Sequence, residues 1–413
     1  MECPDGYITR LGTCFHDRVA ELGVLERVFK KEYDPSLLIV YGSIRVGKSE
    51  LLRYTLSRRV RGLGDIYPVL VDARAEAGRR LFENVNVSIE PVFQTTSRAV
   101  SETARTLVER LSKLDLPMVS KASSLVLFIW DAIEILIRQG RISEDERIYV
   151  VIDEFHELPG YTGIRDRFRD LRILAANILD NENNPRSPWS RIRVVVTVSE
   201  GYIFARDEEG KDLDSRLTGY GARYLLVREM DPESFSKTLE DYCSSKGYRG
   251  DRCQELGEMV ISIAGRLPGW IPDIDGYIVE ATLMKEVREK IERFRAILKR
   301  VSRAEGIEPR DLAKRIYNAF RSKEYCWEHG LSYEVVEELV KSNIAYRYDE
   351  DIYFGTPSFI LRPQIRLYEA AAKLIAENRS INISSKEDLK RILREHEKED
   401  REKETRLLTS SPP

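Results

Sequence analysis

Short apolar runs rich in β-branched residues recur through the first half of the chain, and helical patterns separate them. Five runs share this character: 37–41, 67–71, 148–152, 192–198 and 224–227. An unbroken apolar run suits a strand that is buried on both faces, and alternation with helices indicates βαβ units. The pattern therefore predicts an α/β domain built on a parallel sheet.

From Asp231 onward, helical periodicity replaces the strand pattern. Pro232 and Glu233 follow Asp231, which predicts a helix start with aspartate as the N-cap and proline in the first turn. The periodicity predicts further helices at 282–303, 311–322, 333–342 and 363–377. Before the last of them, two apolar runs flank an acidic turn at 349–351 and predict a tight hairpin over 344–354. Helices followed by such a hairpin have the order of a winged helix.

These patterns divide the chain into four expected parts. We expect an α/β core at 1–230, a helical lid at 231–281, a winged-helix domain at 282–378 and a charged tail at 379–413. Acidic and basic residues are equally frequent in the tail segment 386–406. Such a mixed charge run is typical of a solvated helix or a disordered tail, so we assign it no chemistry.

One segment matches the phosphate-binding pattern G-x-x-x-x-G-K-[ST] and lies between a predicted strand and a predicted helix. Its residues are Gly42, Ser43, Ile44, Arg45, Val46, Gly47, Lys48 and Ser49, and Glu50 follows in the helix. Gly42 and Gly47 free the backbone to form a concave nest of N–H donors that attracts phosphate oxygens. Lys48 supplies a positive charge to the β- and γ-phosphates, and the Ser49 hydroxyl can ligate Mg²⁺. The sequence thus predicts a nucleoside triphosphate site.

A second motif supplies a metal partner and a group for the attacking water. The predicted strand 148–152 ends in Asp153 and Glu154. We assign Asp153 to the Mg²⁺ shell and Glu154 to orienting or deprotonating water. The pair could merely cap a strand before a turn, but the phosphate-binding loop upstream favours the functional interpretation. For His156 a loop or core position is favoured over contact with the γ-phosphate region.

Two weaker candidates follow later strands. Ser199 comes after the run 192–198 and is a candidate to hold the attacking water, with a hydroxyl satisfied by the backbone as the alternative. Arg216 could reach a γ-phosphate, its own or a neighbour's, and stabilise the transition state. A surface ion pair with Asp212 or Asp214 is the alternative for Arg216.

A turn that contains glycine and proline interrupts the predicted helical region at 265–269. Such a turn can place Arg266 and Pro268 over the nucleotide as part of a lid. It can equally be a plain connection that ends one helix before the next.

Together these motifs resemble the archaeal ATPase family of the STAND and AAA+ branch. That family typically shows F-x-x-R-x-x-E-L upstream of the loop, then G-x-R-R-V-G-K-T-x-L-L, I-D-E-F and G-G-x-P. The matching segments here are Phe15-His-Asp-Arg18-Val-Ala-Glu21-Leu22, Tyr41 to Leu52, Val151 to Phe155 and Gly265 to Pro268. The resemblance covers about residues 15 to 375. The chain departs from the pattern at Ser43-Ile44, at Ser49 and at Arg266-Leu267.

The resemblance implies several things about fold and site. The fold would be a P-loop sheet with an additional strand, in the order 5-1-4-3-2, followed by a small helical lid and a winged helix. ATP with Mg²⁺ would be the ligand, and the segment around Phe15 and Arg18 would lie near the adenine.

Composition narrows the class of protein. With 66 basic and 69 acidic residues the chain has a net charge of −3, so no global positive field exists to hold nucleic acid. The five cysteines form no C-x-x-C pair, which indicates reduced thiols of an intracellular protein and neither a disulfide framework nor a zinc site. The most apolar window, 124–137, contains Asp131 and Glu134 and reads as a core helix. We therefore expect a soluble, cytoplasmic protein without membrane contact.

The helix expected to read DNA does not suit that role. Residues 331–342 carry one basic and three acidic side chains, and the expected wing tip at 349–351 is wholly acidic. These charges would repel phosphate, so a docking or regulatory element is favoured. Against this, 285–321 carries 12 basic and 6 acidic residues, which could grip a phosphate backbone or form a solvated face with i,i+4 pairs.

The leading hypothesis is a nucleotide-driven switch, in which ATP and Mg²⁺ bind between the α/β core and the lid, hydrolysis is slow, and the helical and winged domains change their relation to the core. A protein and a second copy of the chain are the candidate partners. The alternative is a DNA-associated ATPase similar to replication initiators or transposition regulators. A small-molecule kinase is a third, weaker hypothesis, because Glu154 suits water activation better than substrate binding.

Overall fold

The computed structural model describes residues 3–59, 66–72, 88–91, 146–157, 164–185, 187–199, 202–203, 209–217, 219–276 and 280–379, with 381, 385, 387–389 and 391–392. The core helix expected at 124–137 lies outside these residues. So does most of the charged tail.

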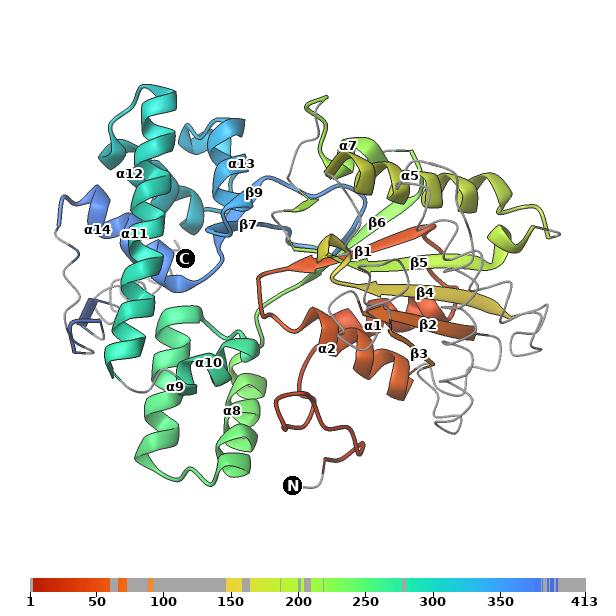
Figure 1. The fold of residues 1–413 in the computed structure, drawn as a ribbon, viewed down its shortest axis with the longest axis horizontal. Coiled ribbons are helices and arrows are strands. Elements are labelled where there is room, and N and C mark those ends of the chain that lie inside the picture. Colours follow the sequence, from red (N-terminus) through yellow and green to blue (C-terminus); the bar gives the residue numbers. More distant parts are fainter. Residues whose placement is uncertain are drawn as a thin grey trace, which may run out of the picture.

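Among the described residues, a seven-stranded, mostly parallel sheet forms the centre of the first half of the fold (Figure 1). Its strands are β1 (Leu37–Gly42), β2 (Ile66–Asp72), β3 (Ser88–Pro91), β4 (Arg147–Asp153), β5 (Ile192–Thr197), β6 (Ala222–Val227) and β8 (Tyr353–Phe354). Five run parallel in the spatial order β6-β1-β5-β4-β2, and β3 and β8 pair antiparallel at the two edges. The five apolar runs correspond to these parallel strands, so the prediction of a parallel α/β sheet is confirmed.

The apolar runs form strands because both faces of the sheet are covered. In β1, Leu37, Ile39 and Tyr41 pack in one hydrophobic cluster, whereas Leu38 and Val40 pack in another on the opposite face. Alternation of side chains across a strand produces this division. The helices that supply the facing side chains are α5 (Ile164–Asn181) and α7 (Leu213–Leu217) on the first face and α1 (Val19–Phe29) and α2 (Lys48–Tyr54) on the second. Each fully buried aliphatic side chain contributes about 1.5–3 kcal/mol.

The second half of the chain is mainly helical, as predicted. Its helices are α8 (Pro232–Lys246), α9 (Asp251–Ala264), α10 (Ile271–Gly276), α11 (Glu280–Glu305), α12 (Pro309–Arg321), α13 (Tyr333–Lys341) and α14 (Arg366–Ala376). α8 begins as expected, because the Asp231 carboxylate accepts a hydrogen bond from the Ser234 amide. Short helical turns lie at Thr55–Arg59, Phe155–Glu157, Pro188–Arg191, Pro268–Trp270 and Cys326–His329. No helix among the described residues carries an apolar stretch long enough to cross a membrane.

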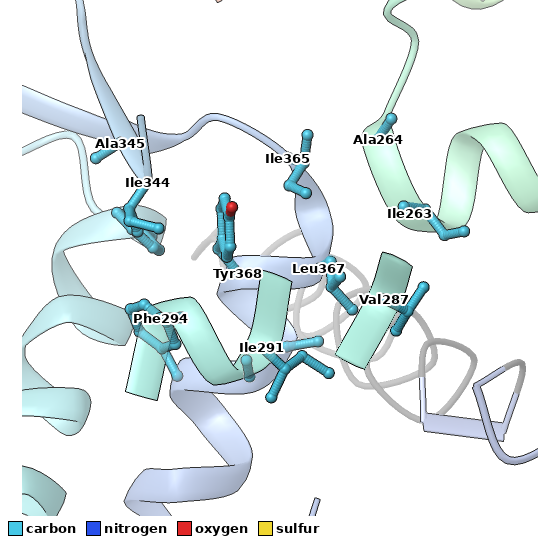
Figure 2. Packing of buried hydrophobic residues seen from close by; sticks show 14 of the residues in the cluster. Ile263, Ala264, Val287, Ile291, Phe294, Ile344, Ala345, Ile365, Leu367 and Tyr368 are labelled. Carbon is cyan, nitrogen blue, oxygen red and sulfur yellow. The ribbon is translucent and has the colours of Figure 1, made fainter. Parts of the chain in front are cut away.

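One hydrophobic core joins the helices of this second half. Ile263 of α9, Phe294 of α11, Ile344 beside β7 and Tyr368 of α14 belong to the same cluster, and Figure 2 shows them packing together. Because close-packed interiors transmit displacements, helices from α9 to α14 are mechanically connected. We call the segment from α8 to α14 the helical half.

The prediction of a tight hairpin over 344–354 is wrong. β7 (Ala345–Tyr348) pairs antiparallel with β9 (Ile360–Pro363), and β8 between them pairs instead with β6 at the edge of the main sheet. Phe354 stacks on Tyr224 at 5.9 Å, and the Arg228 guanidinium donates to backbone carbonyls at the start of this loop. Strand alternation shows that 352–354 is extended, but it does not name the partner strand.

The expectation of reduced cysteines is also wrong. Disulfide bonds join Cys3 to Cys14 and Cys243 to Cys253, with Cα atoms 5.3 and 5.8 Å apart. Cys326 is a buried free thiol, and burial raises its pKa to about 11. The spacing rules for cysteine motifs miss such pairs, because only the N-terminal turn and the α8–α9 hairpin bring the sulfur atoms together.

Candidate functional site

The loop between β1 and α2 has a conformation that requires glycine at two positions. Gly42 has φ +147°, and a Cβ there would collide with the Val227 carbonyl oxygen on β6. Gly47 has φ +103° and forms the N-cap of α2. Because non-glycine residues rarely adopt such angles, this part of the motif is explained by backbone geometry.

Lys48 and Ser49 lie at the start of α2 and face the core of the loop. The Lys48 ammonium is buried and donates to the carbonyl oxygens of Gly42 and Ser43, each at 3.1 Å. The Ser49 hydroxyl donates to Asp153 Oδ1 at 2.9 Å. The two sequence motifs therefore meet in space, as the shared carboxyl edge of parallel strands predicts.

A buried threonine that the sequence analysis did not select holds the end of β4. Thr197, the last residue of β5, donates its hydroxyl to Asp153 Oδ1 at 2.6 Å and accepts from the Glu154 amide at 2.6 Å. Asp153 is thereby fixed by two hydroxyls from neighbouring elements. The sequence signal for Thr197 is a hydroxyl residue at the end of the strand next to β4, and Ser199, two residues later, shares that signal.

Glu154, His156 and Ser199 form a connected group beside Asp153. Glu154 has φ +55°, an uncommon angle that turns the chain sharply after β4. His156 Nε2 lies 3.4 Å from Glu154 Oε2, and the Ser199 amide donates to His156 Nδ1 at 3.4 Å. Since Nδ1 accepts, the proton of a neutral imidazole resides on Nε2 and points to the carboxylate. The histidine thus lies on the site and does not belong to a remote loop.

A pocket of about 590 Å³ opens at this edge of the sheet, a size that suits a nucleotide. It brings together predicted residues from distant parts of the chain: Phe15, Arg18, Ile44, Arg45, Val46, Gly47, Lys48, Ser49, Glu50, Glu154, Ser199 and Pro268. Other predicted residues are not part of its lining: Gly42, Ser43, Asp153, Arg216 and Arg266. Asp153 still contacts the lining through Ser49.

The two predicted arginines have partners away from the lining. Arg216 forms an ion pair with Glu209 at 2.8 Å. Arg266 donates to the Met230 carbonyl at 2.6 Å and lies 3.7 Å from the Glu229 carboxylate. Both guanidinium groups are therefore bound to other residues of the chain.

The turn around Pro268 closes directly on the phosphate-binding loop. Pro268 lines the pocket, and the Gly269 amide donates to the Arg45 carbonyl at 3.1 Å. The Arg45 guanidinium lies over the Trp270 ring at 4.5 Å and forms an ion pair with Asp273 of α10. A Cβ at position 269 would meet the Arg45 backbone, so this close approach requires glycine.

Arg18 ties the N-terminal segment to the same loop. Its guanidinium is buried and donates to the Val46 carbonyl at 2.7 Å and to the Arg228 carbonyl after β6. Burial lowers the pKa of Arg18, and the carboxylate of Glu21 at 3.4 Å opposes this effect. Phe15 stacks on Tyr54 of α2 at 4.0 Å. Arg18 thus acts as a brace for the loop as well as a wall of the pocket.

Residues 3–16 form a cover between α2 and α8, which we call the N-terminal cover (Figure 1). The Cys3–Cys14 disulfide closes it, and residues 9–11 and 13–16 line the pocket. Tyr7 donates to Glu50 of α2 at 2.7 Å. On the other side, the Cys14 amide and the His16 ring both contact the Asp241 carboxylate of α8, at 3.0 and 2.9 Å.

A known sequence family covers the part of the chain that contains most of this site. The sequence model of a family described as an ATPase domain found predominantly in Archaea matches residues 15–249. The chain belongs to this family. The loop from Gly42 to Ser49, Asp153 and Glu154 all lie within the matched region, and the resemblance to archaeal P-loop ATPases is confirmed.

Solved structures similar to this ATPase are distant in sequence. A Walker-type ATPase of Pyrococcus abyssi is 17% identical with a TM-score of 0.47, covering 87% of this chain and 96% of the other. The replication initiator DnaA bound to AMPPCP and single-stranded DNA is 12% identical, with a TM-score of 0.32 and coverages of 79% and 83%. A DNA replication initiation factor is 11% identical, with a TM-score of 0.33 and coverages of 89% and 96%. No curated protein sequence matches the chain.

We expect Cys3→Ser to weaken ATP binding, because this change removes the disulfide that closes the N-terminal cover. Without the disulfide the loop is free, so part of the binding free energy of ATP is spent on ordering it, and we expect an affinity for ATP about three- to tenfold weaker. Calorimetric titration under non-oxidising and non-reducing conditions measures this change. The control is Cys243→Ser, which removes the disulfide between α8 and α9. Equal affinities for the wild type and Cys3→Ser would contradict the covering role.

Proposed function

We propose that this ATPase is a Mg²⁺-dependent switch, in which the nucleotide state changes how the helical half sits on the α/β core. One observation carries the proposal: the pocket is walled by both halves, by Lys48 and Glu154 from the core and by Pro268 and Asn343 from the helical half. A ligand bound there contacts both halves at once. It therefore shifts their relation by the difference in its affinity for the two arrangements.

The fold class supports a finer assignment. Numbered by chain position, the parallel strands run 5-1-4-3-2, with the phosphate-loop strand β1 between β6 and β5. This order supports placement in the STAND and AAA+ branch. We further propose that α8 to α10 act as the lid and that α12, α13 and the β7–β9 pair form a modified winged helix, whose wing loop is bound to the core.

The residues present fit a triphosphate with its metal. Phosphate oxygens would occupy the nest of the loop beside the Lys48 ammonium. The Ser49 hydroxyl and the Asp153 carboxylate, 2.9 Å apart, are the hard oxygen ligands that Mg²⁺ takes in such sites. Mg²⁺ held there would supply positive charge to offset the negative charge that develops on the phosphates during transfer.

Glu154 is the proposed base for water. It lines the pocket one residue beyond Asp153, and its φ of +55° directs it away from the strand axis. The Nε2–H of His156 faces its carboxylate and orients it, while Ser199 fixes the imidazole from the other side. Arg216 does not line the pocket and is paired with Glu209, so we propose no role for it within its own chain.

The DNA-associated alternative receives less support. Arg300 of the basic stretch pairs with Glu338 of α13, Arg310 donates to the Ala376 carbonyl, and Arg321 lies 3.9 Å from Glu369. These internal contacts favour a solvated and paired face over a phosphate-binding one. The acidic loop at 349–351 is engaged by Arg228.

Titration calorimetry and phosphate release test the proposal together. We expect binding heat with ATP, slow turnover in the presence of Mg²⁺, and loss of turnover when EDTA removes the metal. Gel filtration with and without ATP reports any self-association, and a duplex DNA arm at low and high salt reports the alternative. Folded protein that gives no heat with MgATP would overturn the proposed function.

A further inference from the structure

Asn343, a residue of the helical half, lines the pocket, and the proposed function gives it no role. It follows α13 and precedes β7. Its Oδ1 atom is buried without a hydrogen-bond partner among the described residues. A buried unpaired polar atom costs about 1–3 kcal/mol, so its retention calls for an explanation.

Helix capping alone does not account for this side chain. Asn343 has φ +55°, its amide donates to the Val340 carbonyl, and the Ile344 amide donates to the Leu339 carbonyl at 2.8 Å. This arrangement ends α13, and asparagine is tolerated in it. Glycine would serve the cap equally well. The cap explains the backbone angle but leaves the buried amide group unexplained.

A second residue of the helical half fixes the position of this turn against the phosphate-binding loop. Gln364 is buried, and its Oε1 accepts from the Ile44 amide at 3.0 Å. Its Nε2 donates to the Ala345 carbonyl at 3.1 Å, and its backbone amide donates to the Ile344 carbonyl at 2.8 Å. Gln364 therefore bonds the loop on one side and both residues that follow Asn343 on the other.

These contacts lie at the β/γ-phosphate end of the site. Ile44 follows Ser43, whose carbonyl accepts from the Lys48 ammonium, the group that serves the β- and γ-phosphates in such loops. Thr238 of α8 and residues of the N-terminal cover also line the pocket. Through Gln364, the turn that carries Asn343 is held next to the part of the loop that serves the terminal phosphates.

The turn is also tied to the rest of the helical half. Ile344, Ala345 and Ile365, the chain neighbours of Asn343 and Gln364, pack in one core with α9, α11 and α14 (Figure 2). A displacement of Asn343 is therefore transmitted to the packed helices, because its neighbours belong to their core.

We propose that Asn343 is a nucleotide-contacting residue that distinguishes ATP from ADP, and that Gln364 is its positioning residue. Rotation about the last side-chain bond exchanges the Oδ1 and Nδ2 positions, so the amide can donate to a γ-phosphate oxygen. The inference rests on the proposed function. It adds a specific link through which the helical half reads the terminal phosphate.

The test compares ATP and ADP affinities of the wild type with those of Asn343→Gly, by calorimetry in the presence of Mg²⁺. Glycine keeps the left-handed cap and removes the amide. A lost hydrogen bond to a charged phosphate is expected to weaken ATP binding about tenfold or more, with ADP affinity changed by less than about twofold. Asn343→Asp, which brings a negative charge to the same place, is expected to weaken ATP binding further.

Asn378 offers a matched control. It has φ +57° and ends α14 with the same hydrogen-bond pattern, but it is not part of the pocket lining. Asn378→Gly is therefore expected to leave both affinities unchanged. Gln364→Leu is expected to reproduce the selective loss of ATP affinity, and its effect should not add to that of Asn343→Gly, because both variants break one linkage.

These measurements distinguish failure of the proposed function from failure of the role of Asn343. Wild-type protein that fails to bind ATP overturns the proposed function. Wild-type protein that binds ATP, together with an Asn343→Gly variant whose ATP and ADP affinities are unchanged or fall equally, overturns the role of Asn343 alone. Thermal unfolding of each variant shows that the fold is retained.

Discussion

Lys48→Ala is expected to abolish measurable ATP binding. The ammonium is buried beneath the loop and held by the Gly42 and Ser43 carbonyls, where the proposed phosphate site needs a positive charge. Charge-assisted contacts of this kind contribute about 1.5–3 kcal/mol each, and an ammonium on a triphosphate makes more than one. We expect an affinity at least about 100-fold weaker in calorimetric titration.

The control for this variant is Lys30→Ala, which removes a half-exposed lysine next to α1. It is expected to bind ATP like the wild type. Because Lys48 is buried, thermal unfolding of Lys48→Ala has to accompany the titration, and Lys48→Met provides a second variant that fills the same space. Wild-type affinity in a folded Lys48 variant would contradict the assignment of the loop.

Glu154→Gln is expected to bind ATP normally and to lose hydrolysis. Glutamine keeps the shape of the side chain and a hydrogen-bonding oxygen for His156, but it cannot take a proton from water. Loss of a general base reduces turnover by about 10²–10⁴-fold. The measurement is phosphate release at saturating MgATP, with affinity determined on the same preparation.

Glu26→Gln serves as the matched control, because Glu26 lies on α1 and pairs with Lys30 and Arg59 at the surface. It is expected to hydrolyse ATP at the wild-type rate. If Glu154→Gln did the same, another residue would have to activate the water, and the connected group of Glu154, His156 and Ser199 would need a different explanation.

Local patterns predicted the core of this molecule well. The strands were recognisable because both faces of each are buried, and the loop from Gly42 to Ser49 is a contiguous motif whose glycines the backbone requires. The meeting of Ser49 with Asp153 also followed from sequence, because the carboxyl ends of parallel strands share one edge of a sheet.

Features that depend on long-range contacts escaped prediction. Thr197 looked like any strand residue until β5 was placed beside β4. Asn343 and Gln364 reach the site only because the helical half packs against the loop, and no local pattern marks a residue for that. The disulfide of Cys3 with Cys14 likewise depends on how the N-terminal turn folds.

The attachment of β8 to β6 limits how the two halves can separate. Residues 353 and 354 complete the outer margin of the main sheet while belonging to a loop of the helical half. A swing that carried this loop away would leave the outer backbone groups of β6 without partners, and such an unpaired rim readily recruits an extended segment from another molecule. Separation of the two halves therefore costs the backbone hydrogen bonds between β6 and β8.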